Sequence, residues 1–187
     1  MSNGETVSQQ ILTCGDYGTE EEGWADFDRL IELHPDVFKV AREVSGWYVS
    51  QRMNTQAKTP RIDRILFPRK RLVEAGWTHG PIGVEGKTSK KKAGPAISQA
   101  MDYSRAVFQS PFGCHSRIML EWVFVWPIRE VKGAIASIMM QNRIGHVFAR
   151  DDGTLVFKAD QTTAIKLLPS GAIYATELPM GRKVGSR

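Results

Sequence analysis

Two short stretches of the chain decide the predicted fold: residues 61–67, RIDRILF, and residues 82–88, IGVEGKT. Each reads as a short strand, and Pro68 ends the first of them. Charged residues interrupt both stretches, at Asp63 in the first and at Glu85 and Lys87 in the second. Because alternate side chains of a strand share one face, Glu85 and Lys87 are expected to project together. If the two strands are neighbours, three charged groups converge.

Two carboxylates beside an amine suit a divalent cation. Mg²⁺ takes oxygen ligands and keeps several waters, so the pair Asp63 and Glu85 matches its preferences. The ion would bind a scissile phosphate, stabilise developing charge and lower the pKa of an attacking water. Lys87 would orient or activate that water and offset the charge of the phosphate. These residue types therefore favour phosphodiester chemistry.

A helix is expected after these strands, over residues 96–108, because apolar residues recur there at spacings of three and four. Gln99 and Tyr103 stand four residues apart in it and so share one face. Gln99 can both donate and accept hydrogen bonds, and Tyr103 adds a hydroxyl and a ring. Together they would brace the metal site or contact a nucleic-acid backbone.

The order of these motifs resembles the PD-(D/E)XK nuclease superfamily, and most closely its RecB-like branch, which carries a QxxxY motif after the ExK strand. The resemblance covers residues 24–127 in element order. It implies an α/β fold with a restriction-endonuclease-like core, a mixed central sheet flanked by helices. The chain after residue 128 reads as a β-rich C-terminal extension. The motif residues are Asp63, Glu85, Gly86, Lys87, Gln99 and Tyr103.

The resemblance also implies roles for individual residues. In this family the aspartate, the glutamate and the carbonyl that follows it bind the metal, which implies Asp63, Glu85 and Gly86. The family lysine corresponds to Lys87, and the QxxxY pair completes the catalytic set. Many members add a glutamate from the first helix, for which Glu32 is the first candidate and Glu43 the second. Ile62 replaces the family proline before the aspartate.

Charge is distributed very unevenly along the chain. Residues 1–36 hold nine acids and one base, whereas residues 58–92 hold ten bases and three acids. A concentrated basic stretch around a few acids is what a polyanion site requires, with a solvated charged surface as the alternative interpretation. DNA is the predicted partner. The candidates for phosphate contact are Arg64, Arg69, Lys90, Lys91 and Lys92.

The remaining patterns predict one α/β domain at residues 23–178, preceded by a loose acidic leader (1–22) and followed by a basic tail (179–187). Further expected elements are a helix at 24–34, a strand or hairpin at 38–49 with a turn near Ser45-Gly46, a surface loop at 68–80, a strand at 117–127, a helix at 129–141, a hairpin at 147–149 and 154–157, and strands at 163–168 and 172–177. Trp122, Phe124 and Trp126 alternate within the strand 117–127. Core packing is the favoured interpretation of these rings, and a base-stacking platform is the alternative.

Several classes of protein fit poorly. The longest apolar run, Ile118 to Ile128, contains Glu121 and is shorter than the ~20 residues that span a bilayer. The polar N-terminus lacks the features of a signal peptide, so we expect the cytoplasm. Cys14 and Cys114 are expected to be reduced thiols.

The predicted function is a Mg²⁺- or Mn²⁺-dependent nuclease that hydrolyses phosphodiester bonds in DNA. Many such enzymes act as dimers, so a homodimer is compatible with the sequence. One alternative is a DNA-binding module on the same fold without catalysis. Another is a P-loop NTPase, because Gly86-Lys87-Thr88 matches the end of that motif; Pro81, however, stands where the first glycine is needed.

Overall fold

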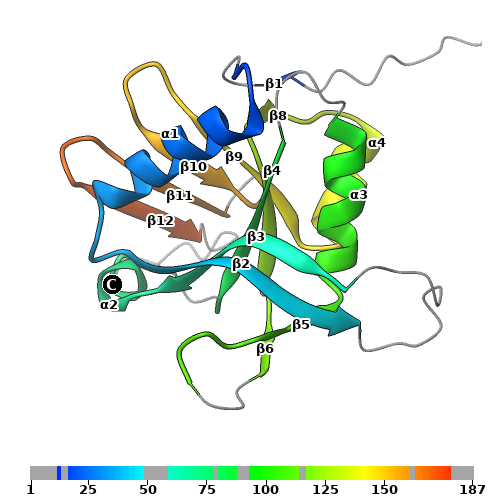
Figure 1. Cartoon of the computed structure of the whole chain (residues 1–187). Helices are drawn as coiled ribbons and strands as arrows, with labels where there is room; N and C mark the ends of the chain where they lie inside the picture. Colours follow the sequence, from blue (N-terminus) through cyan, green and yellow to red (C-terminus); the bar gives the residue numbers. More distant parts are fainter. Residues whose placement is uncertain are drawn as a thin grey trace, which may run out of the picture.

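The protein is a mixed α/β structure in which helices flank a large mixed sheet (Figure 1). The computed structural model describes residues 12–13, 17–48, 59–77, 80–87, 93–113, 117–160 and 163–177. Its elements are β1 (Leu12–Thr13), α1 (Glu20–Glu32), β2 (Phe38–Tyr48), β3 (Arg61–Pro68), α2 (Lys70–Glu74), β4 (Ile82–Gly86), α3 (Ala93–Tyr103), β5 (Ala106–Gln109), β6 (Arg117–Met119), β7 (Trp122–Trp126), β8 (Ile128–Glu130), α4 (Ala134–Gln141), β9 (Ile144–Ala149), β10 (Leu155–Lys158), β11 (Thr163–Leu167) and β12 (Ile173–Glu177).

The strand order across the main sheet is β12-β11-β10-β9-β7-β4-β3-β2-β5-β6. The three central strands β4, β7 and β9 are parallel, and every other neighbouring pair is antiparallel. The N-terminal meander β2–β3–β4 is therefore joined to β7 by a crossover that includes α3, and β7 to β9 by one that includes α4. Parallel strands need such crossovers, which explains why the helices fall between them.

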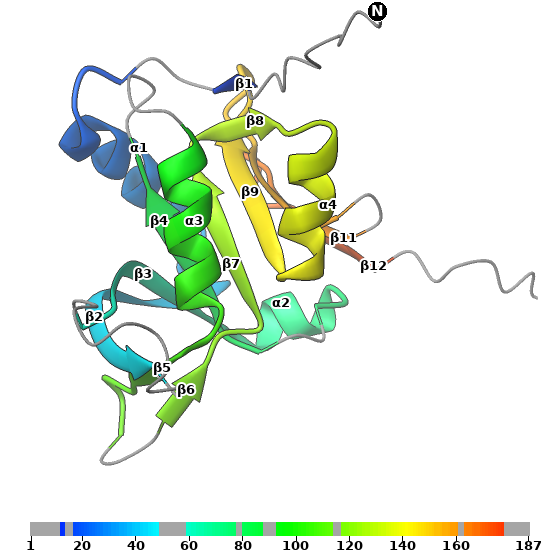
Figure 2. The ribbon, with the colours of Figure 1, turned by 90° about the vertical axis from the view of Figure 1, so that its right-hand side faces the viewer.

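Two hydrophobic clusters lie on the two faces of the sheet. On one face α1 contributes Phe27, which contacts Trp126 and Phe157 at ring-centroid distances of 5.3 and 6.2 Å. On the other face α3 and α4 stand side by side (Figure 2) and bury Ala100 and Met139. The central strands are covered on both sides, as is usual for parallel strands.

Several predicted elements are confirmed. The strands that carry Asp63 and Glu85 form, and so do the hairpin of β9 and β10 and the two strands that follow it. The rings of Trp122, Phe124 and Trp126 are buried, which confirms core packing and excludes the stacking platform. No helix within the described ranges has the length and apolar character needed to cross a bilayer.

Other predicted boundaries were wrong. The apolar run 117–127 holds two strands: β6 lies at the edge of the sheet and β7 at its centre. The helix after β4 ends at Tyr103, because residues 106–109 form β5 beside β2. Similarly, residues 128–130 are a strand rather than the start of α4, and the loop 68–80 contains α2.

Strand β2 runs through Ser45-Gly46 without the predicted turn. A Cβ at Gly46 would lie 2.3 Å from the Val107 carbonyl oxygen, so the glycine admits β5 at close range.

The first helix begins at Glu20, inside the segment predicted as a loose leader. Thr19 accepts a hydrogen bond from the backbone N–H of Glu22, and the Glu22 carboxylate accepts one from the backbone N–H of Thr19. This reciprocal pair satisfies backbone donors at the helix start and fixes its position. Residues 1–11 and 14–16, the tail 179–187 and both cysteines lie outside the described residues.

Candidate active site

Strand register brings the two predicted carboxylates together. Arg64 pairs with Val84 across β3 and β4, and the same register continued by one position sets Asp63 against Glu85. Oδ2 of Asp63 accepts a hydrogen bond of 3.0 Å from the Gly86 N–H. The charge of Asp63 acts on the Glu85 carboxyl group and favours its protonated form. The two acids therefore form one site at the end of the β3–β4 ladder.

Lys87 completes this cluster from the residue that follows β4. Its backbone N–H donates to the Trp126 carbonyl at 2.9 Å, which extends the alignment with β7. Its Nζ lies 2.5 Å from Glu85 Oε1 and 3.9 Å from Glu20 Oε1. Burial tends to lower the pKa of the Lys87 amine, but the neighbouring carboxylates of Glu85, Glu20 and Asp63 raise it on balance. The amine is a cation surrounded by acids.

Glu85 is buried more deeply than its charge favours. Only 1% of its surface is exposed, and its Oε2 atom has no hydrogen-bond partner in the protein. Burial, followed by the nearby charge of Asp63, raises the pKa of Glu85 to about 8, and the Lys87 ammonium offsets this only in part. A carboxylate pair that includes an unsatisfied oxygen fits a divalent cation, whose charge would favour the ionised form of both groups.

Among the described residues, no three His, Cys, Asp or Glu side chains form a group that could hold a metal ion. Mg²⁺ does not require such a group, because it keeps several waters and is commonly bound through one or two carboxylates. The residues that fit this ion here are Asp63 and Glu85.

The stability of the metal-free protein is expected to fall as pH rises. The fold raises the pKa of Glu85 from 4.5 to about 8, so its contribution is full below pH 4.5 and is lost as pH rises through 8. The loss is at most roughly 5 kcal/mol. Thermal unfolding in EDTA between pH 4 and 9 measures it. Glu85→Gln should flatten the curve, and identical pH profiles for the variant and the native protein would contradict the assignment.

Gln99 and Tyr103 support the site from α3 without reaching its centre. Gln99 Nε2 donates to the Tyr103 hydroxyl at 2.6 Å, and that hydroxyl donates to the Arg61 carbonyl at 2.7 Å. Burial and the nearby charge of Glu85 raise the pKa of Tyr103, so the hydroxyl stays protonated. Because Arg61 lies two residues before Asp63 on β3, this chain of hydrogen bonds helps to position Asp63.

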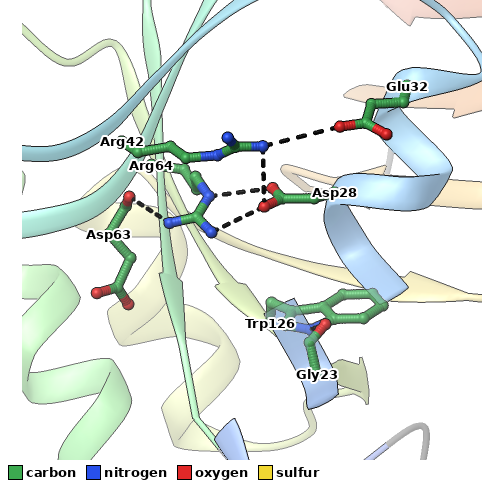
Figure 3. A network of polar contacts seen from close by, with 7 residues as sticks. All are labelled: Gly23, Asp28, Glu32, Arg42, Asp63, Arg64 and Trp126. Atoms are coloured by element: carbon green, nitrogen blue, oxygen red, sulfur yellow. Dashed lines mark hydrogen bonds and ion pairs between the residues drawn. The ribbon is translucent and has the colours of Figure 1, made fainter. Parts of the chain in front are cut away.

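Helix α1 is held over the end of β4 by two tryptophans. Trp126 Nε1 donates to the Gly23 carbonyl at 3.0 Å (Figure 3). A Cβ at Gly86 would lie 2.4 Å from the Trp24 ring, so only glycine lets this ring lie against β4. These contacts bring Glu20, at the start of α1, toward Lys87.

Glu20, and not the predicted Glu32, is therefore the α1 glutamate that lies near the cluster. Glu32 stands twelve residues further along α1, about 18 Å away at the rise of an α-helix. Its side chain is 73% exposed and lies 3.9 Å from Arg42. The second candidate, Glu43, is exposed and pairs with Arg61. The missed signal was the capping pair at Thr19 and Glu22, which sets the helix start.

The phosphate-contact prediction for Arg64 is replaced by a structural role. Its guanidinium donates two hydrogen bonds to Asp28, at 3.1 and 2.9 Å, and a third of 2.9 Å to the Asp63 carbonyl (Figure 3). It also lies 4.4 Å from the Trp24 ring centroid, and its side chain is only 10% exposed. Arg64 thus fixes α1 and β3 relative to one another.

The other predicted phosphate contacts are not gathered at the site. Arg69 is exposed, but it follows the end of β3 opposite to Asp63, about 20 Å away along an extended strand. Lys90, Lys91 and Lys92 lie outside the described residues.

The P-loop alternative loses its structural basis. Residues 82–86 form strand β4, which pairs with β3 on one side and with β7 on the other. A phosphate-cradling loop would need these residues in a turn that leads into a helix.

Comparisons of this chain with protein-family models, with curated proteins and with solved structures find no match.

Proposed function

We propose that this protein is a nuclease that uses Mg²⁺ or Mn²⁺ to hydrolyse phosphodiester bonds in DNA, on a restriction-endonuclease-like core of the PD-(D/E)XK type. The observation that carries the proposal is that Asp63 bonds to the backbone next to the buried Glu85, whose Oε2 atom lacks a partner. Two such carboxylates beside the Lys87 amine form the constellation that metal-assisted phosphodiester hydrolysis requires.

The order of elements supports the same proposal. The chain runs α1, then the meander β2–β3–β4, then α3, then β7 beside β4. This is the helix, three strands, helix and strand on which the resemblance to the RecB-like branch rests. The hairpin β5–β6 is inserted between α3 and β7, and β10–β12 extend the sheet beyond β9.

Each residue of the site has a distinct task in the proposed reaction. Asp63, Glu85 and the Gly86 carbonyl would hold the ion, which supplies Lewis-acid stabilisation of phosphate charge when bound. Lys87 would orient the attacking water and offset negative charge on the phosphate. Glu20 lies close enough to Lys87 to keep the amine charged.

The decisive experiment incubates the full chain with supercoiled plasmid and with linear duplex DNA, in Mg²⁺, in Mn²⁺ and in EDTA. Cleavage is expected with either ion and none in EDTA. Nicking of the plasmid would identify an endonuclease, and loss of linear DNA alone would identify an exonuclease. A mobility shift of the DNA on a native gel without cleavage under any condition would contradict catalysis. It would instead indicate that the protein is a DNA-binding module.

A further inference from the structure

A cavity of about 200 Å³ lies beneath α4, apart from the site described above. Strands β9 and β10 form its floor, on the face of the sheet that α3 and α4 cover (Figure 2). Its walls combine apolar side chains, among them Met139 and Met140, with the polar side chains of His146, Lys158 and Asp160. A cavity of about 150 Å³ can hold a benzene ring, so a single ring fits this volume.

One wall of the cavity contains a histidine with an unpaired ring nitrogen. His146 is 8% exposed, and its Nε2 atom is buried without a partner in the protein. A neutral imidazole carries one N–H and one acceptor nitrogen. A buried ring nitrogen left unpaired is costly unless a ligand forms a hydrogen bond with it.

The cationic side chain of Lys158 lies beside this histidine. Lys158 lies directly opposite His146 in the β9–β10 ladder, and the charge of its ammonium disfavours protonation of the imidazole. Burial and then Lys158 lower the pKa of His146 to about 4, although Glu130 acts in the opposite direction, so the ring is neutral near pH 7. The Asp160 carboxylate accepts hydrogen bonds from Thr163, at 2.6 Å from its N–H and 3.3 Å from its hydroxyl.

We propose that Nε2 of His146 is the acceptor nitrogen of the ring, and that this cavity binds a small acid with an apolar body and one O–H or N–H donor. The donor would bond to Nε2 of His146, the negative group would face Lys158, and the apolar body would pack against the methionines of α4. Ligand binding in this cavity does not depend on the proposed nuclease activity. The two sites lie on different strands: His146 on β9 is aligned with Val125 on β7, which in turn is aligned with Glu85 on β4.

Three probes separate these interactions: 4-hydroxybenzoate, benzoate, which lacks the donor, and phenol, which lacks the negative group. Calorimetry on the full chain should show 4-hydroxybenzoate binding at least about tenfold more tightly than either analogue, because each analogue leaves one group unpaired. The ¹⁵N resonance of His146 Nε2 should also shift with 4-hydroxybenzoate, a measurement that needs no variant.

Two variants complete the test. His146→Leu should reduce the affinity for 4-hydroxybenzoate to that for benzoate while benzoate binding is retained, which controls for folding. Lys158→Met should remove the advantage over phenol, whereas Lys166→Met, on the neighbouring strand and outside the cavity lining, should change nothing. Equal affinity of the native protein for 4-hydroxybenzoate and benzoate, or an unmoved Nε2 resonance at saturation, would overturn the proposal. So would failure of all three probes to bind.

Discussion

Asp63→Asn is expected to lower metal-dependent DNA cleavage by about a thousandfold or more. The substitution keeps the size of the side chain but removes the charge that would hold a divalent ion opposite Glu85. Loss of metal stabilisation amounts to several kcal/mol in such reactions, and ~4 kcal/mol corresponds to about a thousandfold in rate. The measurement is the single-turnover rate on linear DNA over a range of Mg²⁺ concentrations.

Two glutamates of helix α1 provide a matched control for this result. Glu20→Gln should slow cleavage by about tenfold, because Glu20 acts on Lys87 from 3.9 Å. Glu32→Gln should leave the rate unchanged, since its carboxylate is exposed at the other end of the helix. Equal rates for the native protein and Asp63→Asn would remove the basis of the proposed function. A loss with Glu32→Gln but not with Glu20→Gln would reverse the assignment on α1.

Arg64→Met is expected to reduce the free energy of unfolding by about 2–4 kcal/mol. Removing the guanidinium leaves the Asp28 carboxylate, itself mostly buried, without its bidentate partner. Breaking a buried pair in this way costs about 3–5 kcal/mol, and the partial exposure of both groups together with the remaining contact to Arg42 reduces that range. Denaturant unfolding in EDTA measures the change.

The partner substitution separates this pair from simple loss of packing. Asp28→Asn in the Arg64→Met background should restore part of the stability, because no unpaired charge then remains. Arg42→Met is the control, since its half-exposed guanidinium should contribute about 1 kcal/mol or less. If the double variant were no more stable than Arg64→Met alone, the ion pair would not be the cause.

The sequence was sufficient to find the residues on β3 and β4. Strand alternation sets which side chains project together, so Glu85 and Lys87 could be placed on one face before any coordinates. That Asp63 lies opposite Glu85 depends on register, which the apolar pattern constrains because a slip of one residue would invert both faces. The deep burial of Glu85 followed from neither rule, since it depends on how α3 covers β4.

Two of the missed features depend on how segments far apart in the chain meet, and the third depends on where a helix begins. The charge distribution predicts a phosphate contact for Arg64, because a count of charges cannot reveal that Asp28, 36 residues away, is its partner. The apolar pattern predicts a single strand over residues 117–127, because such a pattern does not show where one strand ends and the chain crosses to another place in the sheet. Glu20 is not among the candidates because the apolar pattern starts the predicted helix at residue 24, and such a pattern locates the middle of a helix better than its start.

The contact between Phe27 and Phe157 has a consequence for synthesis on the ribosome. Helix α1 packs against a strand whose Phe157 is translated 130 residues after Phe27, a delay of roughly 10 s at ordinary elongation speeds. Until then its apolar side has no complete partner, and Glu20 cannot settle beside Lys87. A nascent chain that does not yet include β10 therefore lacks part of the apolar surface against which α1 packs.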